Sequence, residues 1–176
     1  MYPVIRLLRS TFGARFRSSL SVFETSEFNF YVRPWDIDMF MELNNGRILT
    51  LFDLGRFDLA VRCGLSRQLK ANRWGLVVAG TTIRYRKRIL LGQHVSIKTR
   101  LVAADARWLY LQQTALVDET ACCSAIVRTA VTKDKRLHPV SDVAQQMGED
   151  FSSLAGFDWV NSWIELEDQR PWPPTD

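Results

Sequence analysis

Acidic and amide side chains stand just before a predicted helix, at a spacing that suits chemistry on a carbonyl group. Asp36 and Asp38 lie in the segment WDIDMFMELNN, and Asn44 and Asn45 end it. Asparagine is a preferred helix cap, so we expect a helix that begins at about Gly46. Free backbone N–H groups at a helix start carry partial positive charge, which makes those of Asn45 and Gly46 candidate donors to a carbonyl oxygen. Asp38 could attack that carbonyl or activate a water molecule.

Each of the acidic residues also has a structural interpretation. Asp36 and Asp38 could simply accept hydrogen bonds from loop amides, and we prefer this for Asp36. Asp53 falls on the predicted apolar helix, where an acid needs a partner, and Arg56 follows three residues later. We therefore favour an ion pair for Asp53, with catalysis as the alternative. Glu42 is either solvated or a second carboxylate that raises a pKa near Asp38.

A dense basic run, RYRKR, follows a predicted strand. Strand alternation would place Arg84, Arg86 and Arg88 on one face and Tyr85 and Lys87 on the other. The run is either a phosphate site or a solvated strand edge that resists aggregation. No aromatic platform is interleaved with it, so we do not expect a nucleic-acid partner.

These residues need a scaffold, and hydrophobic periodicity predicts one. A helix over Gly46–Cys63, ended by Gly64, is apolar on nearly all faces and should be buried. Strands are expected over residues 28–32, 76–87, 94–103, 108–117 and 121–132, a short helix and loop over 65–74, and a short helix over 141–147. We therefore predict an α+β domain in which an antiparallel sheet of about five strands wraps around one long central helix.

Composition excludes several function classes. The 176 residues are 47% apolar, enough for one domain with a substantial core. No apolar run reaches the ~20 residues that a membrane helix needs. The three cysteines indicate a reducing compartment. The sequence contains neither a CxxC nor an HxxxH motif, so we do not expect a structural zinc site. The two histidines, His94 and His138, lie outside the central helix, which argues against chemistry that depends on histidine.

The chain divides into three predicted segments: a basic amphipathic helix over 1–26, a domain over 27–147, and a tail with tryptophan and proline over 148–176. Residues 1–23 contain no acid, and their apolar residues recur at helical spacing. This helix could pack on its own domain, lie on an anionic membrane surface or act as an organellar targeting segment; we favour the first two. Tail tryptophans should pack on the domain or on a partner subunit. The N-terminal cations are Arg6, Arg9, Arg15 and Arg17, the apolar residues are Ile5, Leu8, Phe12, Phe16, Leu20 and Phe23, and the tail tryptophans are Trp159, Trp163 and Trp172.

Several motifs in fixed order resemble the hot-dog-fold acyl-CoA thioesterases of the 4-hydroxybenzoyl-CoA thioesterase type, in particular the branch that includes thioesterase superfamily member 6. The resemblance covers residues 28–140. It departs from the family pattern at Met41 and Glu42, where the motif has glycine and histidine. The matching positions are Asp36, Asp38, Asn44 and Asn45 before the helix, Phe52, Asp53 and Arg56 on it, Tyr85, Lys87, Gly92 and Gln93 after the next strand, and His138–Pro139.

The resemblance implies a hot-dog fold and hydrolysis of an acyl-CoA to a carboxylic acid and CoA, with no metal or other cofactor. It also implies a homodimer or homotetramer. We expect a cytoplasmic protein, and peripheral membrane contact through residues 1–23 stays open. The alternative function is a non-catalytic acyl-binding or membrane-associated hot-dog protein. The implied catalytic residues are Asp38, Asn45, Gly46 and Asp53, and the implied substrate-binding residues are Asn44, Arg86, Lys87 and Arg88.

Overall fold

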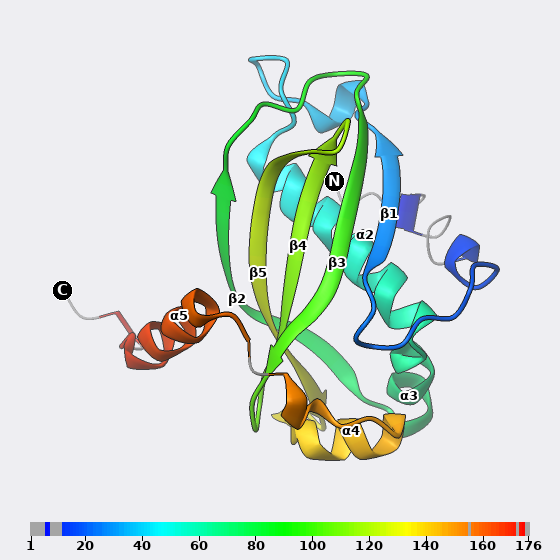
Figure 1. Ribbon diagram of the computed structural model, residues 1–176, viewed down its shortest axis with the longest axis vertical. Helices are drawn as coiled ribbons and strands as arrows, with labels where there is room; N and C mark the ends of the chain where they lie inside the picture. Colours follow the sequence, from blue (N-terminus) through cyan, green and yellow to red (C-terminus); the bar gives the residue numbers. More distant parts are fainter. Residues whose placement is uncertain (1–5, 8–11, 155, 172, 175–176) are drawn as a thin grey trace.

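The computed structural model describes residues 6–7, 12–154, 156–171 and 173–174. One long helix is followed by a run of antiparallel strands, and shorter helices lie at the end of the chain (Figure 1). The elements in order are β1 (Ser26–Tyr31), η1 (Pro34–Asp36), α2 (Asn45–Arg62), α3 (Leu65–Asn72), β2 (Gly75–Tyr85), β3 (His94–Ala104), β4 (Leu109–Val117), β5 (Thr120–Lys133), β6 (Arg136–Leu137), α4 (Val140–Met147), η2 (Phe151–Ser153) and α5 (Asp158–Gln169).

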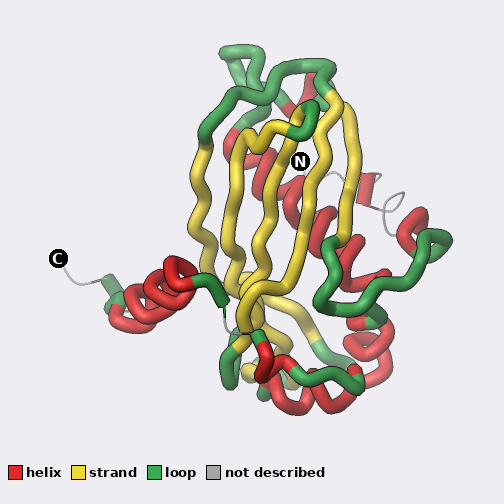
Figure 2. Tube along the Cα trace, viewed as in Figure 1, coloured by secondary structure: helices red, strands yellow, loops and turns green. Residues whose placement is uncertain are grey.

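The strands form one sheet in the order β1-β3-β4-β5-β2, and the short β6 pairs with β5. All pairings are antiparallel. Figure 2 shows this sheet lying across α2, which runs diagonally behind it. The predicted α+β architecture is therefore confirmed, including the five main strands and the single central helix. Strand β2 is an edge strand, because β5 is its one neighbour in the sheet as described.

Helix α2 begins and ends where the sequence predicts. The side-chain Oδ1 of Asn44 accepts hydrogen bonds from the N–H groups of Gly46 and Arg47, at 2.9 and 3.1 Å. Cys63 closes the helix, and Gly64 adopts a left-handed conformation with φ of 83°, which glycine tolerates without strain. The two local signals, an amide cap and a terminal glycine, thus fix both ends of the element that positions the site.

Close packing fixes the distance between α2 and the sheet. A Cβ atom on Gly55 would lie 2.8 Å from Thr99 Oγ1 and 2.9 Å from Ile97 Cγ2, so no larger residue fits there without a shift. Gln113 is buried at the same contact, and its Nε2 donates to the carbonyl of Phe52 at 2.8 Å and to Thr99 Oγ1 at 2.9 Å. The sheet and the helix are therefore joined by a polar contact inside an apolar core.

The prediction of an N-terminal amphipathic helix is wrong for residues 15–25. Residues 12–14 are helical, but residues 15–25 form turns and extended loop. Phe12 and Phe16 are exposed, and Phe23 stands at the edge of the domain beside Phe151. The predicted helical residues Ile5, Leu8 and Arg9 lie outside the described residues. Arg17, which follows the helical stretch, instead contacts the domain at Asp58 and at the carbonyl of Glu27, which the one-dimensional pattern does not show.

Two N-terminal arginines form ion pairs with buried carboxylates. Arg6 Nη2 lies 2.9 Å from Asp36 Oδ2, and Arg17 Nη1 lies 3.1 Å from Asp58 Oδ1. Both acids are almost completely buried. An isolated buried carboxylate is strongly unfavourable, so these contacts fasten the N-terminal segment to the domain.

A C-terminal helix, α5, is not among the elements that the sequence predicts. Val160 is buried in it, and the ring of Trp163 meets Tyr110 edge to face at a centroid distance of 6.2 Å. Trp159 is instead exposed, and Trp172 lies outside the described residues. None of the described helices combines the length and the apolar character needed to cross a membrane.

Candidate active site

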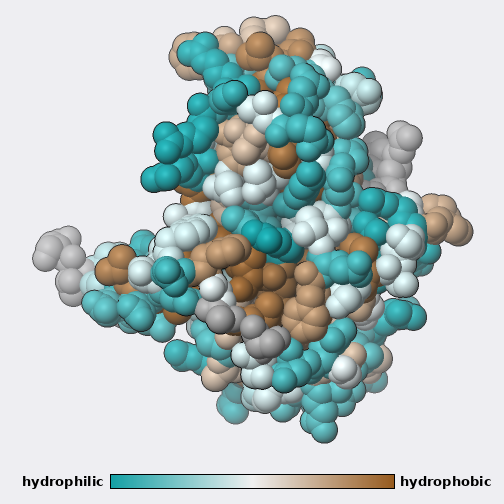
Figure 3. Space-filling view, in the orientation of Figure 1, coloured by the Kyte–Doolittle hydropathy of each residue, from teal (hydrophilic) through white to brown (hydrophobic). Residues whose placement is uncertain are grey.

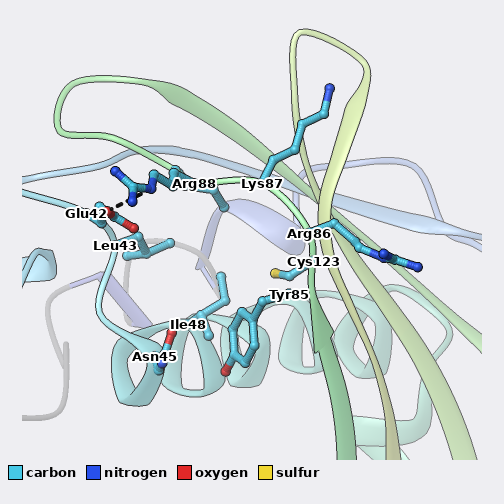
Figure 4. Close-up of a pocket in the computed structure, with 10 residues that line it drawn as sticks. Glu42, Leu43, Asn45, Ile48, Tyr85, Arg86, Lys87, Arg88 and Cys123 are labelled. Carbon is cyan, nitrogen blue, oxygen red and sulfur yellow. Dashed lines mark ion pairs between the residues drawn. The ribbon is translucent and has the colours of Figure 1, made fainter.

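A cleft of about 240 Å³ opens where the N-terminus of α2 meets the end of β2 (Figure 4). Its walls come from the loop before α2, the first turns of α2, the segment after β2, and one residue of β5. The cleft combines a carboxylate, an amide, a phenol and a run of cations with an apolar floor. The lining residues are Glu42, Leu43, Asn45, Ile48, Tyr85, Arg86, Lys87, Arg88, Ile89 and Cys123.

The basic run turns out of the sheet at this cleft. Strand β2 ends at Tyr85, and the N–H groups of Arg86 and Lys87 both donate to the carbonyl of Cys122, at 2.8 and 3.0 Å. Figure 4 shows the side chains of Arg86, Lys87 and Arg88 pointing in three directions. The predicted alternation of faces is therefore wrong beyond Tyr85, because the segment is no longer extended strand.

Glu42 is the carboxylate that faces the cleft. Its Oε1 lies 3.1 Å from Arg88 Nε, an ion pair that Figure 4 marks with a dashed line. From the sequence, Glu42 is expected either to be solvated or to be a second carboxylate near Asp38, and its place in the cleft is not predicted. The feature of the sequence that could have indicated Glu42 as a cleft residue is its position, three residues before the end of the WDIDMFMELNN segment.

Asp38 shapes the loop that carries Glu42. Its Oδ1 accepts hydrogen bonds from the N–H groups of Phe40 and Glu42, at 2.8 and 3.4 Å. Its own N–H donates to the carbonyl of Glu42 at 2.8 Å. The side chain is partly exposed and does not line the cleft. These contacts match the structural interpretation, and the catalytic role of Asp38 stays a prediction.

Of the two predicted backbone donors at the start of α2, one belongs to a residue that lines the cleft. The side chain of Asn44 already accepts from Gly46 N–H, so this predicted donor is occupied by the cap. Asn45 lines the cleft, and its N–H has no acceptor among the residues that the structure describes. Asn45 is therefore the stronger of the two predicted carbonyl donors, and Asn44 acts as the cap that orients it.

Asp53 lies outside the cleft, on the outer side of α2. It forms the expected ion pair with Arg56, which also donates to Gln113 Oε1. Burial raises the pKa of Asp53, and the nearby Arg56 opposes that rise. Leu49 and Phe57, four residues away on either side, share this stripe of the helix and are partly exposed. Asp53 thus borders an apolar surface rather than the cleft.

Asp36 has a structural role, as predicted. It is buried and lies between Arg6 and Arg47, whose Nε is 3.2 Å from Asp36 Oδ1. Its Oδ2 also accepts from the N–H of Arg33 at 3.1 Å. Its backbone carbonyl accepts from Asn44 N–H at 2.9 Å, so Asp36 ties the N-terminal segment to the helix cap.

Two further cleft residues escaped the sequence analysis as site residues. Burial raises the pKa of Tyr85, so its hydroxyl keeps its proton at neutral pH and can donate a hydrogen bond. Burial also raises the pKa of the Cys123 thiol to about 12, so it is a neutral wall of the cleft and not a thiolate nucleophile. Among the described residues, no group of three or more His, Cys, Asp or Glu is placed to hold a metal ion.

Comparison with known proteins decides the family. Residues 32–151 match the family model described as the thioesterase-like superfamily. The chain belongs to this superfamily. Protein THEM6 of Danio rerio is 35% identical over 92 residues, which is 52% of this chain and 46% of the zebrafish protein. Protein THEM6 of Drosophila melanogaster is 30% identical over 111 residues, 62% of this chain and 58% of the fly protein. The chain thus spans about half the length of these relatives.

Solved structures confirm the hot-dog fold. The probable thioesterase YbaW of Escherichia coli superimposes with a TM-score of 0.66 at 18% identity, covering 72% of this chain and 98% of that one. A thioesterase of Thermus thermophilus, solved in complex with coenzyme A and Zn, has a TM-score of 0.61 at 20% identity and covers 69% and 90%. Because both structures are less than 25% identical to this chain in sequence, the comparison shows a shared fold and nothing more.

Proposed function

We propose that the protein hydrolyses an acyl-CoA thioester to a carboxylic acid and free CoA. The observation that carries the proposal is the cleft at the N-terminus of α2, which is lined by Asn45, by the carboxylate of Glu42 and by the basic run. In the reaction, the oxygen of water bonds to the carbonyl carbon and the carbon–sulfur bond breaks. The sulfur leaves as the CoA thiolate, which takes up a proton. Asn45 N–H stabilises the negative charge that develops on the carbonyl oxygen.

Two carboxylates compete for the role of base or nucleophile. Asp38 matches the family motif, whereas Glu42 faces the cleft. The two share one short loop, in which Asp38 Oδ1 accepts a hydrogen bond from Glu42 N–H. We assign the catalytic step to Asp38 and the positioning of Arg88 to Glu42. Carboxylate-to-amide variants of the two residues separate these roles.

Lys87 and Arg88 are proposed to hold CoA phosphates, with Arg86 at the side of the cleft. The cleft, at about 240 Å³, is smaller than the usual ~300–1,000 Å³ of a small-molecule site. It suits the thioester end of the substrate, and the nucleotide would lie outside on the basic run. The coenzyme A complex of the Thermus thermophilus thioesterase, which has the same fold, supports this substrate class.

A homodimer, with a tetramer as the alternative, is proposed from the edge of the sheet. Strand β2 has an unpaired edge, and its residues Leu76, Val77 and Val78 are exposed. Leu49 and Phe57 of α2 are also partly exposed, although the helix is apolar on nearly all sides. Pairing of β2 with a second copy would cover this surface and bring a partner beside the cleft. Light scattering coupled to size-exclusion chromatography measures the state.

Release of CoA thiol from a panel of acyl-CoAs, detected with a chromogenic disulfide, tests the activity directly. The panel includes aliphatic chains of several lengths and aromatic acyl groups. Turnover above the rate without protein supports the proposal. Binding of acyl-CoA without thiol release would support the alternative, a non-catalytic acyl-binding protein. The cytoplasmic location and membrane contact through residues 1–23 stay predictions.

A further inference from the structure

An exposed apolar tip stands at the end of the molecule that carries the cleft. Its side chains are 37–87% exposed, with the greatest exposure at Met39 (87%) and Phe40 (72%). The bridge between Glu42 and Leu90 joins the two loops that carry the tip. Figure 3 shows tan and brown apolar residues at this end, where Figure 1 places both loops. The residues of the apolar tip are Trp35, Met39, Phe40, Met41, Leu90 and Leu91.

The surroundings of the apolar tip are basic. Arg33, Lys87 and Arg88 are exposed beside it, and Arg88 is the one of the three that forms an ion pair with a described carboxylate. The pair of Glu42 and Arg88 is neutral as a whole, which leaves the cations Arg33 and Lys87 against the carboxylate of Asp38 in these loops. Apolar side chains flanked by cations such as Arg33 and Lys87 are complementary to an anionic lipid surface, where the apolar groups enter the headgroup region and the cations meet lipid phosphates.

Met41 gives an independent observation. Its φ is 62°, the left-handed region in which any residue with a Cβ is strained and glycine is not. The side chain is more than half exposed, so packing within the chain does not account for methionine at this place. A long apolar side chain is therefore held in water at a conformational cost, which a contact outside the chain would offset.

We propose that the apolar tip inserts into the surface of an anionic membrane, with the cleft facing the lipid. The occupant is a lipid surface rather than a second copy of the chain, because the exposed cations around the tip would repel those of another copy. This surface is separate from the contact predicted for residues 1–23, in which Arg6 and Arg17 form ion pairs with Asp36 and Asp58. A membrane-bound tip would give the cleft access to acyl compounds that partition into lipid.

Co-sedimentation of the full chain with vesicles tests the proposal. Vesicles of phosphatidylcholine with phosphatidylserine should bind the protein, vesicles of phosphatidylcholine alone should bind it less, and added salt should weaken binding. The Met39→Ser/Phe40→Ser variant should lower the partition coefficient by at least about tenfold. Met41→Gly should also lower it, and its melting temperature should be unchanged or raised because the substitution relieves strain.

Matched variants separate the apolar tip from the rest of the surface. Leu166→Ser on α5 removes an exposed apolar residue elsewhere and should leave binding unchanged. The proposal is overturned if the wild-type chain does not sediment with anionic vesicles, or if Met39→Ser/Phe40→Ser binds as the wild type does. The proposal would also be overturned if the Phe12→Ser/Phe16→Ser variant lost vesicle binding while the tip variant kept it, because the N-terminal segment would then be the membrane contact. A tip variant that changes only the oligomeric state would overturn it too, and would identify the tip as an interface between copies.

Discussion

Arg17 forms an ion pair with Asp58 across 41 residues of sequence, with Nη1 3.1 Å from Oδ1. Asp58 is buried on the central helix, and Ser26 Oγ donates to its other oxygen at 2.5 Å. Arg62, one turn along the helix, lies 3.5 Å from the same oxygen. The N-terminal segment thus supplies part of the charge that a buried acid of the core requires. The segment that looks like an appendage in sequence contributes to the stability of the domain.

Replacement of Arg17 by alanine should therefore destabilise the fold. Asp58 would lose one cation but keep Arg62 and Ser26, so we expect a loss of about 1–3 kcal/mol in the free energy of unfolding. Denaturant unfolding monitored by tryptophan fluorescence measures it. Arg15→Ala, two residues away at an exposed position, should change the free energy by less than about 0.5 kcal/mol. Equal losses in the two variants would contradict the role of the ion pair.

Asp53 should make stability depend on pH in a direction set by its raised pKa. The folded state holds the proton more tightly than the unfolded state, whose Asp pKa is about 3.8. The contribution of Asp53 to the free energy of unfolding is therefore fully present below pH 3.8 and falls as the pH rises through its folded pKa. The side chain is one third exposed, which limits the size of the effect.

Urea unfolding of the wild type and of Asp53→Asn across pH 3–7 measures this contribution as the difference between the two proteins. Asp150 is a control of opposite sign, because hydrogen bonds from Ser152 lower its pKa. Its contribution should be present above its ordinary pKa and be lost as the pH falls. A difference that rises with pH for Asp53 would mean that its pairing with Arg56 outweighs burial.

The two loop carboxylates should respond differently to amide substitution. Asp38→Asn keeps an oxygen that can accept from Phe40 N–H, so the loop should be retained, but it removes the proposed base or nucleophile. We expect kcat to fall by about 10²-fold or more. Glu42→Gln should lower kcat by less than about tenfold, because its role is to position Arg88. Thiol release and melting temperature are measured for both. Normal turnover in a folded Asp38→Asn variant, with loss in Glu42→Gln, would transfer the chemistry to Glu42.

The cations beside the cleft should affect KM rather than kcat. Lys87→Ala/Arg88→Ala should raise KM for an acyl-CoA by about tenfold, and the effect should shrink at high salt. Arg86→Ala should have a smaller effect, because its side chain points away from the Glu42–Arg88 pair (Figure 4). Lys133→Ala, an exposed lysine on β5, is the charge-matched control. An acyl-pantetheine lacks the nucleotide phosphates, so an equal rise in KM with that substrate would show a structural role instead.

The sequence by itself determined the central helix and the strands of the sheet. Asn44 and Gly64 act within a few residues of themselves, so the ends of α2 are local properties. Alternation of buried and exposed residues along a strand is also local, and residues 97–101 of β3 show it, whereas most of β5 is buried on both faces. Helix α5 also has a local signal, since Val160, Trp163 and Ile164 recur at helical spacing, but the sequence prediction for residues 148–176 is a tail that packs on the domain or on a partner subunit.

Only the tertiary structure decided where the charged residues lie. The pairing of Arg17 with Asp58 and of Arg88 with Glu42 depends on distances between segments far apart in sequence. Arginine and lysine side chains are long and flexible, so they can pair with any acid that the fold brings within their reach. The partner of such a side chain therefore cannot be derived from spacing along the chain. The same reason explains why Glu42 rather than Asp38 faces the cleft: a short loop reverses direction, and side-chain directions within it follow hydrogen bonds that the sequence does not reveal.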